Sequence, residues 1–361
     1  MARKKASKKS TVTWQNHLGW ALVGCISLLG IILLLRPAWL GLGERQAPDP
    51  TPSVQIDNNF SVLLLGYGGE DHQGGTLTDT IILANINQDT KRIALISIPR
   101  DLWVSLPLEN EVLQTKINAA YSLSDPKITK QLVGEITTFQ PDYYAAVDFN
   151  TFVRAIDTIG PLEIDVPYTF DDYFYPIDGK EDDSCGFSAS EIATLTARLS
   201  GFDLEQKFPC RYEHLHFDKG VQQMDGSTAL KFVRSRHSGT GGGDFGRSER
   251  QQAFIQSVMK EVLTFSFITK VVPLAQELGA GVKTDFPVSA LPEVLSAVGN
   301  RNEYSTHSIV LNSEGTLVDA TSRDGQAILN PSSGEGNWDS IHALIERSML
   351  QATASGELKS E

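Results

Sequence analysis

Short apolar runs alternate with amphipathic stretches in the first half of this chain, and this alternation constrains the fold more than any other feature. Apolar runs typical of strands occupy residues 61–66, 80–87, 92–98, 143–149 and 162–166. Amphipathic stretches typical of helices occupy residues 128–139 and 150–158. Strands that alternate with helices predict an α/β sandwich built on one sheet. A turn at Asp89 and Thr90 predicts a hairpin, so the sheet should be mixed.

The second half of the chain is less regular. Helices are expected over residues 225–234 and 246–265, with weaker candidates at residues 268–278, 291–298 and 339–350. The segment at about 171–219 is rich in aromatic residues and shows no clear period. We interpret this segment as an irregular insertion into the α/β domain.

The N-terminal segment predicts a membrane anchor. Residues 18–35 carry no charge, and as a helix they would span roughly 27 Å, close to the thickness of the hydrocarbon core. Basic residues precede this run, which predicts a cytoplasmic N-terminus. A cleaved signal peptide shares these features, but the absence of an A-x-A-like site after the run favours an uncleaved anchor.

The expected organisation follows from this anchor. Residues 1–17 form a basic cytoplasmic tail, residues 18–36 a transmembrane helix and residues 37–59 a proline-containing linker. Residues 60–350 form an extracytoplasmic domain, and residues 351–361 a flexible tail. Cys185 and Cys210 lie in the exported part, where an oxidising compartment favours a disulfide over two free thiols.

A basic stretch at residues 231–252 contrasts with the rest of the sequence. It holds five basic side chains around a glycine-rich loop, although the chain has a net charge of −13. These side chains are Lys231, Arg234, Arg236, Arg247 and Arg250. Arginine forks match phosphate oxygens two at a time, so the stretch predicts a phosphate clamp rather than a surface loop of salt bridges. The acidity of the remaining chain argues against nucleic-acid binding.

Three further stretches carry groups that could serve the same anion. Asp79 lies where a glycine-rich loop enters a strand, a position in which a carboxylate can hold Mg²⁺ or cap a turn. Arg100 follows a strand that ends at Pro99, and ligands of α/β sheets often bind at strand ends. Lys116 could bring a second cation to the same place.

Seven pieces of sequence in this order resemble the LytR-CpsA-Psr family. They are LLLG at 63–66, TDTIIL at 78–83, SIPRD at 97–101, KINAAY at 116–121, YYAAVDF at 143–149, DGSTALKFVRSR at 225–236 and DFGRSERQQ at 244–252. Single pieces are weak signals, but the ordered set covers about residues 60–265. The resemblance implies an α/β/α sandwich around a mixed sheet, with one N-terminal transmembrane helix.

The resemblance also implies a function. Members of that family are membrane-anchored phosphotransferases that move a glycopolymer from a polyprenyl-pyrophosphate carrier to a cell-wall acceptor such as peptidoglycan. By resemblance, Asp79 holds Mg²⁺, and Asp79, Arg100 and Asp244 are the catalytic residues. The residues expected to bind the pyrophosphate are Lys116, Arg234, Arg236, Arg247 and Gln251. Leu77 and Gly68 stand where the family usually has an arginine and an aspartate.

The residues also allow other functions. Cleavage of a pyrophosphate requires cations and a carboxylate base, and sequence cannot tell whether Asp79 or Asp244 is that base. A polyprenyl-pyrophosphate phosphatase would need nearly the same residues, with water as acceptor. A non-enzymatic envelope protein that binds a ligand or attenuates transcription would tolerate loss of Asp79. The lipid requires an apolar channel, to which residues such as Phe254 and Ile255 could contribute if they are not core.

Overall fold

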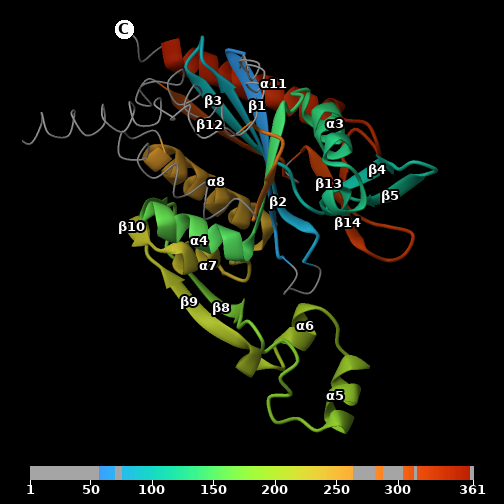
Figure 1. Cartoon of the computed structure of the whole chain (residues 1–361). Coiled ribbons are helices and arrows are strands. Elements are labelled where there is room, and N and C mark those ends of the chain that lie inside the picture. Colours follow the sequence, from blue (N-terminus) through green and yellow to red (C-terminus); the bar gives the residue numbers. More distant parts are fainter. Residues whose placement is uncertain (1–56, 70–74, 263–280, 288–303, 313–314, 358–361) are drawn as a thin grey trace, which may run out of the picture. The chain divides into compact units, whose positions relative to one another are not determined.

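A six-stranded mixed sheet forms the centre of the protein (Figure 1). The structure is a computed structural model, and it describes residues 57–69, 75–262, 281–287, 304–312 and 315–357. The strand order is β11-β6-β1-β2-β3-β12. The strands are β1 Asn59–Tyr67, β2 Thr78–Asn87, β3 Arg92–Ser97, β6 Tyr143–Asp148, β11 Val282–Thr284 and β12 Ser305–Val310. β1, β2 and β3 pair antiparallel, whereas β1–β6 and β3–β12 are parallel pairs.

The two faces of this sheet bury different side chains. Along β1 and β2, Leu63 lies opposite Leu83, and the next pair, Leu64 and Ile82, points to the other face. The Leu63 face packs against α3 (Pro126–Thr137) and α11 (Asp339–Glu357). The opposite face packs against α8 (Gly243–Val262). A strand buried on both faces needs a nearly continuous apolar run, which explains the sequence VLLL in β1.

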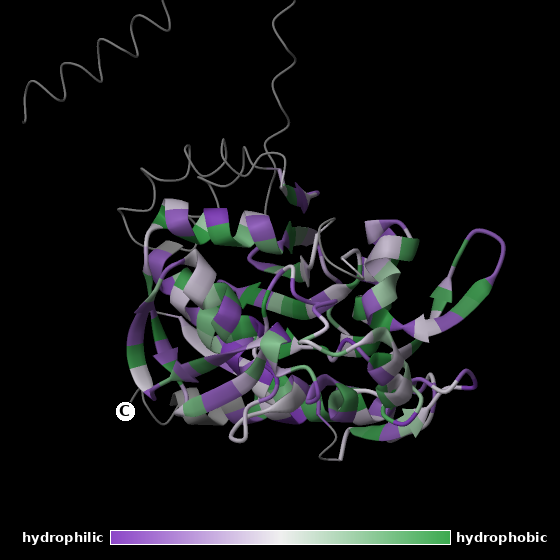
Figure 2. Ribbon diagram, turned by 90° about the horizontal axis from the view of Figure 1, so that it is seen from below, coloured by the Kyte–Doolittle hydropathy of each residue, from purple (hydrophilic) through white to green (hydrophobic). Residues whose placement is uncertain are grey.

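Helices therefore cover both faces of the sheet. On the α8 side, α4 (Phe149–Ile159) and α7 (Gly226–Arg234) pack with α8 into a second core. Figure 2 shows hydrophobic residues interleaved with hydrophilic ones along the helices of the protein, as expected of helices with one packed face. The prediction of a mixed α/β fold around a central mixed sheet is confirmed.

Smaller elements surround the central sheet. Antiparallel pairs form between β4 (Trp103–Pro107) and β5 (Val112–Lys116), β7 (Leu162–Val166) and β10 (Gly220–Met224), and β13 (Leu317–Thr321) and β14 (Ala327–Pro331). Two short helices, η1 (Ile117–Ala119) and α2 (Ala120–Leu123), follow β5. None of the helices in the described part of the chain is long and apolar enough to cross a membrane.

A projecting arm spans residues 170–217. Strands β8 (Phe170–Pro176) and β9 (Tyr212–Phe217) pair antiparallel, and α5 (Ala189–Thr196), α6 (Phe202–Glu205) and η2 (Pro209–Arg211) lie between them. A disulfide joins Cys185 and Cys210 within the arm, which confirms that prediction. The segment at 171–219, expected to be irregular, begins and ends in strands instead. The β8–β9 register shifts between Asp172 and Tyr175, and this shift breaks the period of two that reveals a strand.

Other expectations agree within a few residues or fall outside the described residues. The helix expected over 246–265 is α8, which begins at Gly243, and the helix expected over 339–350 is α11. Strands β4, β5 and β10 are not among the elements predicted from sequence. The transmembrane helix at 18–36 and the helices at 268–278 and 291–298 lie outside the described residues.

Candidate functional site

A pocket of about 650 Å³ lies where β1, β2 and β6 meet α4, α7, α8 and the arm. One group of lining residues is apolar or aromatic: Leu64, Leu65, Ala145, Val147, Phe149, Phe152, Phe174, Tyr175, Pro176, Ile177, Tyr212, Leu230, Val233, Phe254 and Ile255. The other group is polar: Asp79, Thr80, Arg100, Asp172, Glu181, Glu205, Arg211, Arg234, Arg236, His237, Arg247 and Gln251. The pocket therefore suits a ligand with an anionic part and an apolar part.

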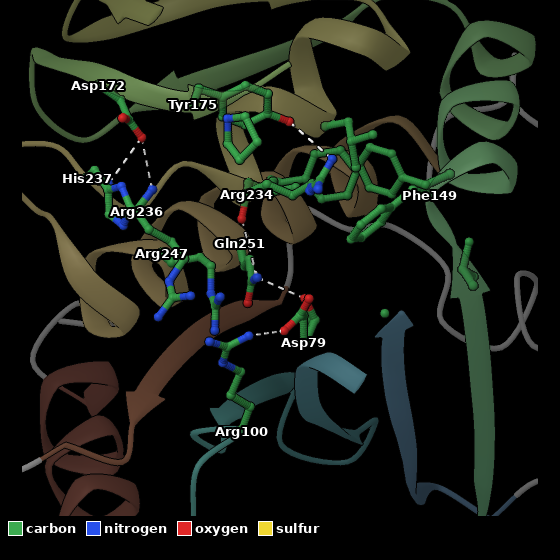
Figure 3. Close-up of a pocket in the computed structure, with 18 of the residues that line it drawn as sticks. Asp79, Arg100, Phe149, Asp172, Tyr175, Arg234, Arg236, His237, Arg247 and Gln251 are labelled. Atoms are coloured by element: carbon green, nitrogen blue, oxygen red, sulfur yellow. Dashed lines mark hydrogen bonds and ion pairs between the residues drawn. The ribbon is translucent and has the colours of Figure 1, made fainter. Parts of the chain in front are cut away.

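Most of the site residues proposed from sequence meet at this pocket. Figure 3 shows Arg100, Arg236 and Arg247 gathered on one side, with Asp79 and Gln251 beside them. The sheet brings Asp79 and Arg100 together, because β2 begins at Thr78 and β3, its antiparallel neighbour, ends at the same edge of the sheet. Arg100 Nη1 donates to Asp79 Oδ1. This bond joins two residues that the sequence places 21 positions apart.

Helix α8 supplies the residues that face this edge. Arg247, Gln251, Phe254 and Ile255 all line the pocket, and their spacing is that of one helix face. Gln251 Nε2 donates to Thr80 Oγ1 at 2.8 Å, so the helix is tied to the strand that carries Asp79. Along this face of α8, the polar Arg247 and Gln251 lie nearer the N-terminal end, and the apolar Phe254 and Ile255 follow them.

Asp244 does not line the pocket, but it holds two residues that do. Its Oδ1 lies 3.1 Å from Arg236 Nη2 and 2.9 Å from Arg247 Nη2. Burial acts to raise the pKa of Asp244, but the nearby Arg247, Arg236 and Arg100 outweigh it, and the pKa is lowered. Burial lowers the pKa of Arg247 to about 10, which keeps it protonated at neutral pH. The carboxylate and the two guanidinium groups are therefore all charged.

Two buried arginine nitrogens in the described part of the site lack a hydrogen-bond partner. Among the described residues, the buried Nε of Arg100 and that of Arg236 have no hydrogen-bond partner. Burial acts to lower the pKa of Arg100, but Asp79, Asp244 and Asp101 outweigh it and raise the pKa. Buried donors without a partner are costly, and the Asp101 carboxylate, 3.6 Å from Arg100 Nε, offsets part of this cost.

Arg234 occupies the border between the polar and apolar sides. Its guanidinium lies 4.1 Å from the centre of the Phe149 ring, and Nη1 donates to Tyr175 Oη at 3.3 Å. Burial raises the pKa of Tyr175 to about 12, so this hydroxyl stays protonated at neutral pH. The aromatic contacts fix the direction of the Arg234 fork.

Two basic residues of the 231–252 stretch do not face the pocket. Arg250 is fully buried and donates to backbone carbonyls of Phe232, Gly241 (2.7 Å) and Ser235, so it holds the loop between α7 and α8. Lys231 pairs with Glu213 at 2.7 Å. Residue type alone could not separate these structural cations from the ligand-facing ones.

The glycines of this loop serve close packing. Gly241 has φ of +61°, and a Cβ there would lie 2.0 Å from the Tyr168 ring. A Cβ on Gly246 would lie 1.7 Å from the carbonyl oxygen of Gly241. Only glycine fits at these two positions, so the loop is tightly turned rather than open.

Lys116 is the one proposed site residue that does not reach the pocket wall or contact a wall arginine. Its Nζ lies 2.6 Å from Asp101 Oδ1, and Asp101 Oδ2 lies 3.6 Å from Arg100 Nε. Lys116 is thus linked to the pocket through Asp101. The sequence places Asp101 in the SIPRD stretch but gave no reason to assign it a role.

The donor set at Asp79 fits a Mg²⁺ ion that is shared with a substrate. Mg²⁺ is often held by one or two carboxylates, with phosphate oxygens and waters completing its octahedron. Asp79 lines the pocket, and its side chain is 37% exposed. In the described residues, the only group with three ligand atoms near one another contains Cys185 and Cys210, which form the disulfide. Asp79 would therefore contribute a single carboxylate.

The fold and this pocket define a mixed α/β protein whose pocket combines a cluster of arginines with an apolar wall. Comparison with known proteins specifies the family: the LytR_cpsA_psr family model matches residues 43–331, so the chain belongs to the LytR-CpsA-Psr family. This confirms the resemblance drawn from the seven sequence pieces.

Relatives of known sequence and structure agree with this assignment. The teichoic acid transferase TagU of Oceanobacillus iheyensis is 27% identical over 327 residues, which are 85% of this chain and 88% of that protein. The regulatory protein MsrR of Staphylococcus aureus is 27% identical over 277 residues, covering 76% of this chain and 71% of MsrR. The structure of Bacillus subtilis TagV superposes with a TM-score of 0.55 and 23% identity, over 81% of this chain and 98% of that one. TagT bound to LIIa-WTA gives a TM-score of 0.54 and 19% identity, over 81% and 92% of the two chains.

Proposed function

We propose that this protein is a membrane-anchored phosphotransferase that moves a glycopolymer from a polyprenyl-pyrophosphate carrier to a cell-wall acceptor such as peptidoglycan. One observation carries the proposal: the arginine cluster and the apolar wall lie in the same pocket. A polyprenyl pyrophosphate has both a highly charged and an apolar part. The relative TagU, named a polyisoprenyl-teichoic acid–peptidoglycan teichoic acid transferase, supports this substrate class.

The reaction would exchange a phosphoanhydride bond for a phosphate ester bond. An acceptor hydroxyl attacks the phosphorus that carries the glycopolymer, a new P–O bond forms, and the pyrophosphate bridge breaks. The polyprenyl phosphate leaves with the bridging oxygen, and the hydroxyl proton passes to a carboxylate. Arg100, Arg236 and Arg247 would stabilise the charge that develops on the leaving phosphate.

The two candidate bases differ in their surroundings. Asp244 is held between Arg236 and Arg247, and its lowered pKa makes it a poor proton acceptor. We assign Asp244 to holding the arginines. Asp79 lies on the pocket wall and would receive the proton or hold Mg²⁺. When bound, the ion would neutralise charge on the pyrophosphate oxygens.

Membrane anchoring forms part of the proposal. The anchor at 18–36, uncharged over residues 18–35, would hold the catalytic domain on the outer side of the cytoplasmic membrane, where a lipid-linked substrate is presented. A polyprenyl chain that extends from the bilayer could then enter the apolar part of the pocket.

Substitutions at Asp79 and Arg236 test the proposal. Arg236→Ala removes charge-assisted contacts, so transfer should fall about 10- to 100-fold. Arg236→Lys should recover only part of this loss, because lysine keeps the charge but not the fork. Asp79→Ala should abolish both transfer and its dependence on Mg²⁺. The measurement is transfer of labelled glycan from a lipid-pyrophosphate donor to peptidoglycan fragments.

A matched arginine provides the control for this test. Arg154 is exposed on α4, its side chain donates to Thr151 Oγ1, and it does not line the pocket, so Arg154→Ala should transfer at the parent rate. If Asp79→Ala and Arg236→Ala also kept the parent rate, the phosphotransferase proposal would be wrong. A binding or regulatory role, which the name of MsrR suggests, would then replace it. Release of phosphorylated polymer without an acceptor would instead indicate a phosphatase.

A further inference from the structure

Asp172 is a buried carboxylate whose two oxygens are both engaged. The residue is 1% exposed and lies in β8, where the strand register shifts. Its Oδ1 accepts from the backbone N–H of Phe174 at 2.9 Å. Its Oδ2 accepts from Ser235 Oγ at 2.7 Å and from two further backbone N–H groups, those of Arg236 at 3.0 Å and His237 at 3.1 Å. A buried carboxylate is tolerated when donors surround it in this way.

The three donors to Oδ2 form the turn that presents the arginines. Helix α7 ends at Arg234, and Ser235 leaves the helix with φ of −50° and ψ of 136°. Arg236 follows and lines the pocket. A further contact, the bridge between Asp172 and Ser238, continues along the same segment. Figure 3 shows Asp172 directed at this turn, on the far side of Arg236 from Asp79.

We infer that Asp172 is a positioning residue for the arginine clamp. It fixes the backbone of residues 235–237, and through this backbone it directs the Arg236 guanidinium toward the pyrophosphate. The inference rests on the proposed function, because it takes a prenyl pyrophosphate as the ligand of the clamp. It also assigns a role to the arm: strand β8 of the arm carries the carboxylate, so the arm and the clamp are held in one arrangement.

The chemistry of the site requires a carboxylate rather than an amide. Both oxygens accept, and all four partners are donors. Asparagine has nearly the same volume but offers only one acceptor oxygen, and its NH₂ group would face donors. Asp172→Asn therefore removes part of the turn's support while keeping the size of the side chain.

A double-mutant cycle tests the inference. Binding of geranylgeranyl pyrophosphate, measured by calorimetry, should weaken about tenfold or more in Asp172→Asn. If Asp172 acts through Arg236, the same substitution in an Arg236→Ala background should change affinity less than about twofold. A purely structural role would give equal fold-changes in the two backgrounds, and that result would overturn the inference.

Two further variants keep the test decisive. Asp157 also accepts from a backbone N–H, that of Gly226 at the start of α7, but it does not line the pocket. Asp157→Asn should leave the affinity at the parent value. If Asp172→Asn does not fold, Ser235→Ala removes a single donor to the same oxygen and should weaken binding about threefold, with no further loss when combined with Arg236→Ala.

The outcomes separate this inference from the proposed function. If the parent protein binds the prenyl pyrophosphate and Asp172→Asn binds it with the same affinity, only the inference is contradicted. If the parent protein binds the prenyl pyrophosphate but transfers no glycan, the proposed function is contradicted. The double-mutant cycle then still decides the role of Asp172. A parent protein that bound no prenyl pyrophosphate would contradict both.

Discussion

Asp244 shows how one side chain can organise a charged site. A single oxygen contacts both Arg236 and Arg247, which approach it from the loop and from helix α8. The side chain is 25% exposed, and Arg247 is nearly buried. Without the carboxylate, the two guanidinium groups would repel each other where water screens them poorly.

The lowered pKa of Asp244 predicts an acid-dependent loss of stability. A carboxyl group with a lowered pKa in the folded state contributes stability above its ordinary value of 3.8, and this contribution is lost as pH falls through the lower folded value. We expect Asp244→Asn to lower the free energy of unfolding by about 2 kcal/mol at pH 6. The difference between parent and variant should shrink as pH falls below 3.8. Urea unfolding at a series of pH values measures both, and a difference that stays constant with pH would contradict the prediction.

Sequence identified the types of residue in the site better than their orientation. Arginines flanking a glycine run predicted a phosphate clamp, and Arg234, Arg236 and Arg247 do line the pocket. Arg250 has the same chemistry but serves as a hydrogen-bond donor to loop carbonyls. Asp172 was missed because three of its four hydrogen-bond partners lie more than 60 positions away, and nothing local marks a carboxylate that accepts from a distant turn.

Within the arm, the helices between β8 and β9 bury no residue, whereas the two strands contribute to the core. Helix α5 has no buried residue, although a capping box at Ser188 and Glu191 stabilises its start. The disulfide between Cys185 and Cys210 closes the segment that contains this helix. Few buried apolar contacts imply low local stability, so the covalent link should be a main constraint on this part of the arm.

Removal of the disulfide should therefore act locally. With both cysteines changed to alanine, we expect faster hydrogen exchange over residues 178–210 and unchanged protection in β1, β2 and β3. The free energy of local opening should fall by about 3 kcal/mol on the chain-entropy estimate. Hydrogen exchange followed by mass spectrometry measures this, and parent protein treated with a reducing agent should behave in the same way. Unchanged exchange in the arm would show that packing, not the cross-link, holds it.

The strands of the central sheet differ in how far sequence could predict them. Strands β1, β2, β3 and β6 are apolar runs bounded by turn residues, so composition and period reveal them. Strand β8 is hidden by its register shift, and β12 has exposed residues at its start that weaken the signal. The pairing of β3 with β12 depends on contacts between distant segments, which local sequence does not encode.

At the scale of the whole molecule, the location of the domain determines whether the proposed reaction can occur. A lipid-linked glycopolymer reaches the pocket only if the domain and the carrier lie on the same side of the membrane. We expect a reporter fused after Glu361 to be active only outside the cytoplasmic membrane, because basic residues precede an uncleaved apolar segment. Paired fusions of alkaline phosphatase and β-galactosidase measure this. Activity of the cytoplasmic reporter would refute the anchor and most of the proposed function.

The parallel pairing of β3 with β12 also has a consequence for how the chain is made. Residues 305–310 are made long after residues 92–97, so during synthesis β3 can pair with β2 on one side while its other edge stays open; five of its six residues are buried in the finished fold. Contacts between such distant segments form slowly. A chain stalled or truncated before residue 305 would expose this apolar edge to other chains, and it should aggregate even though every residue that lines the pocket has already been synthesised.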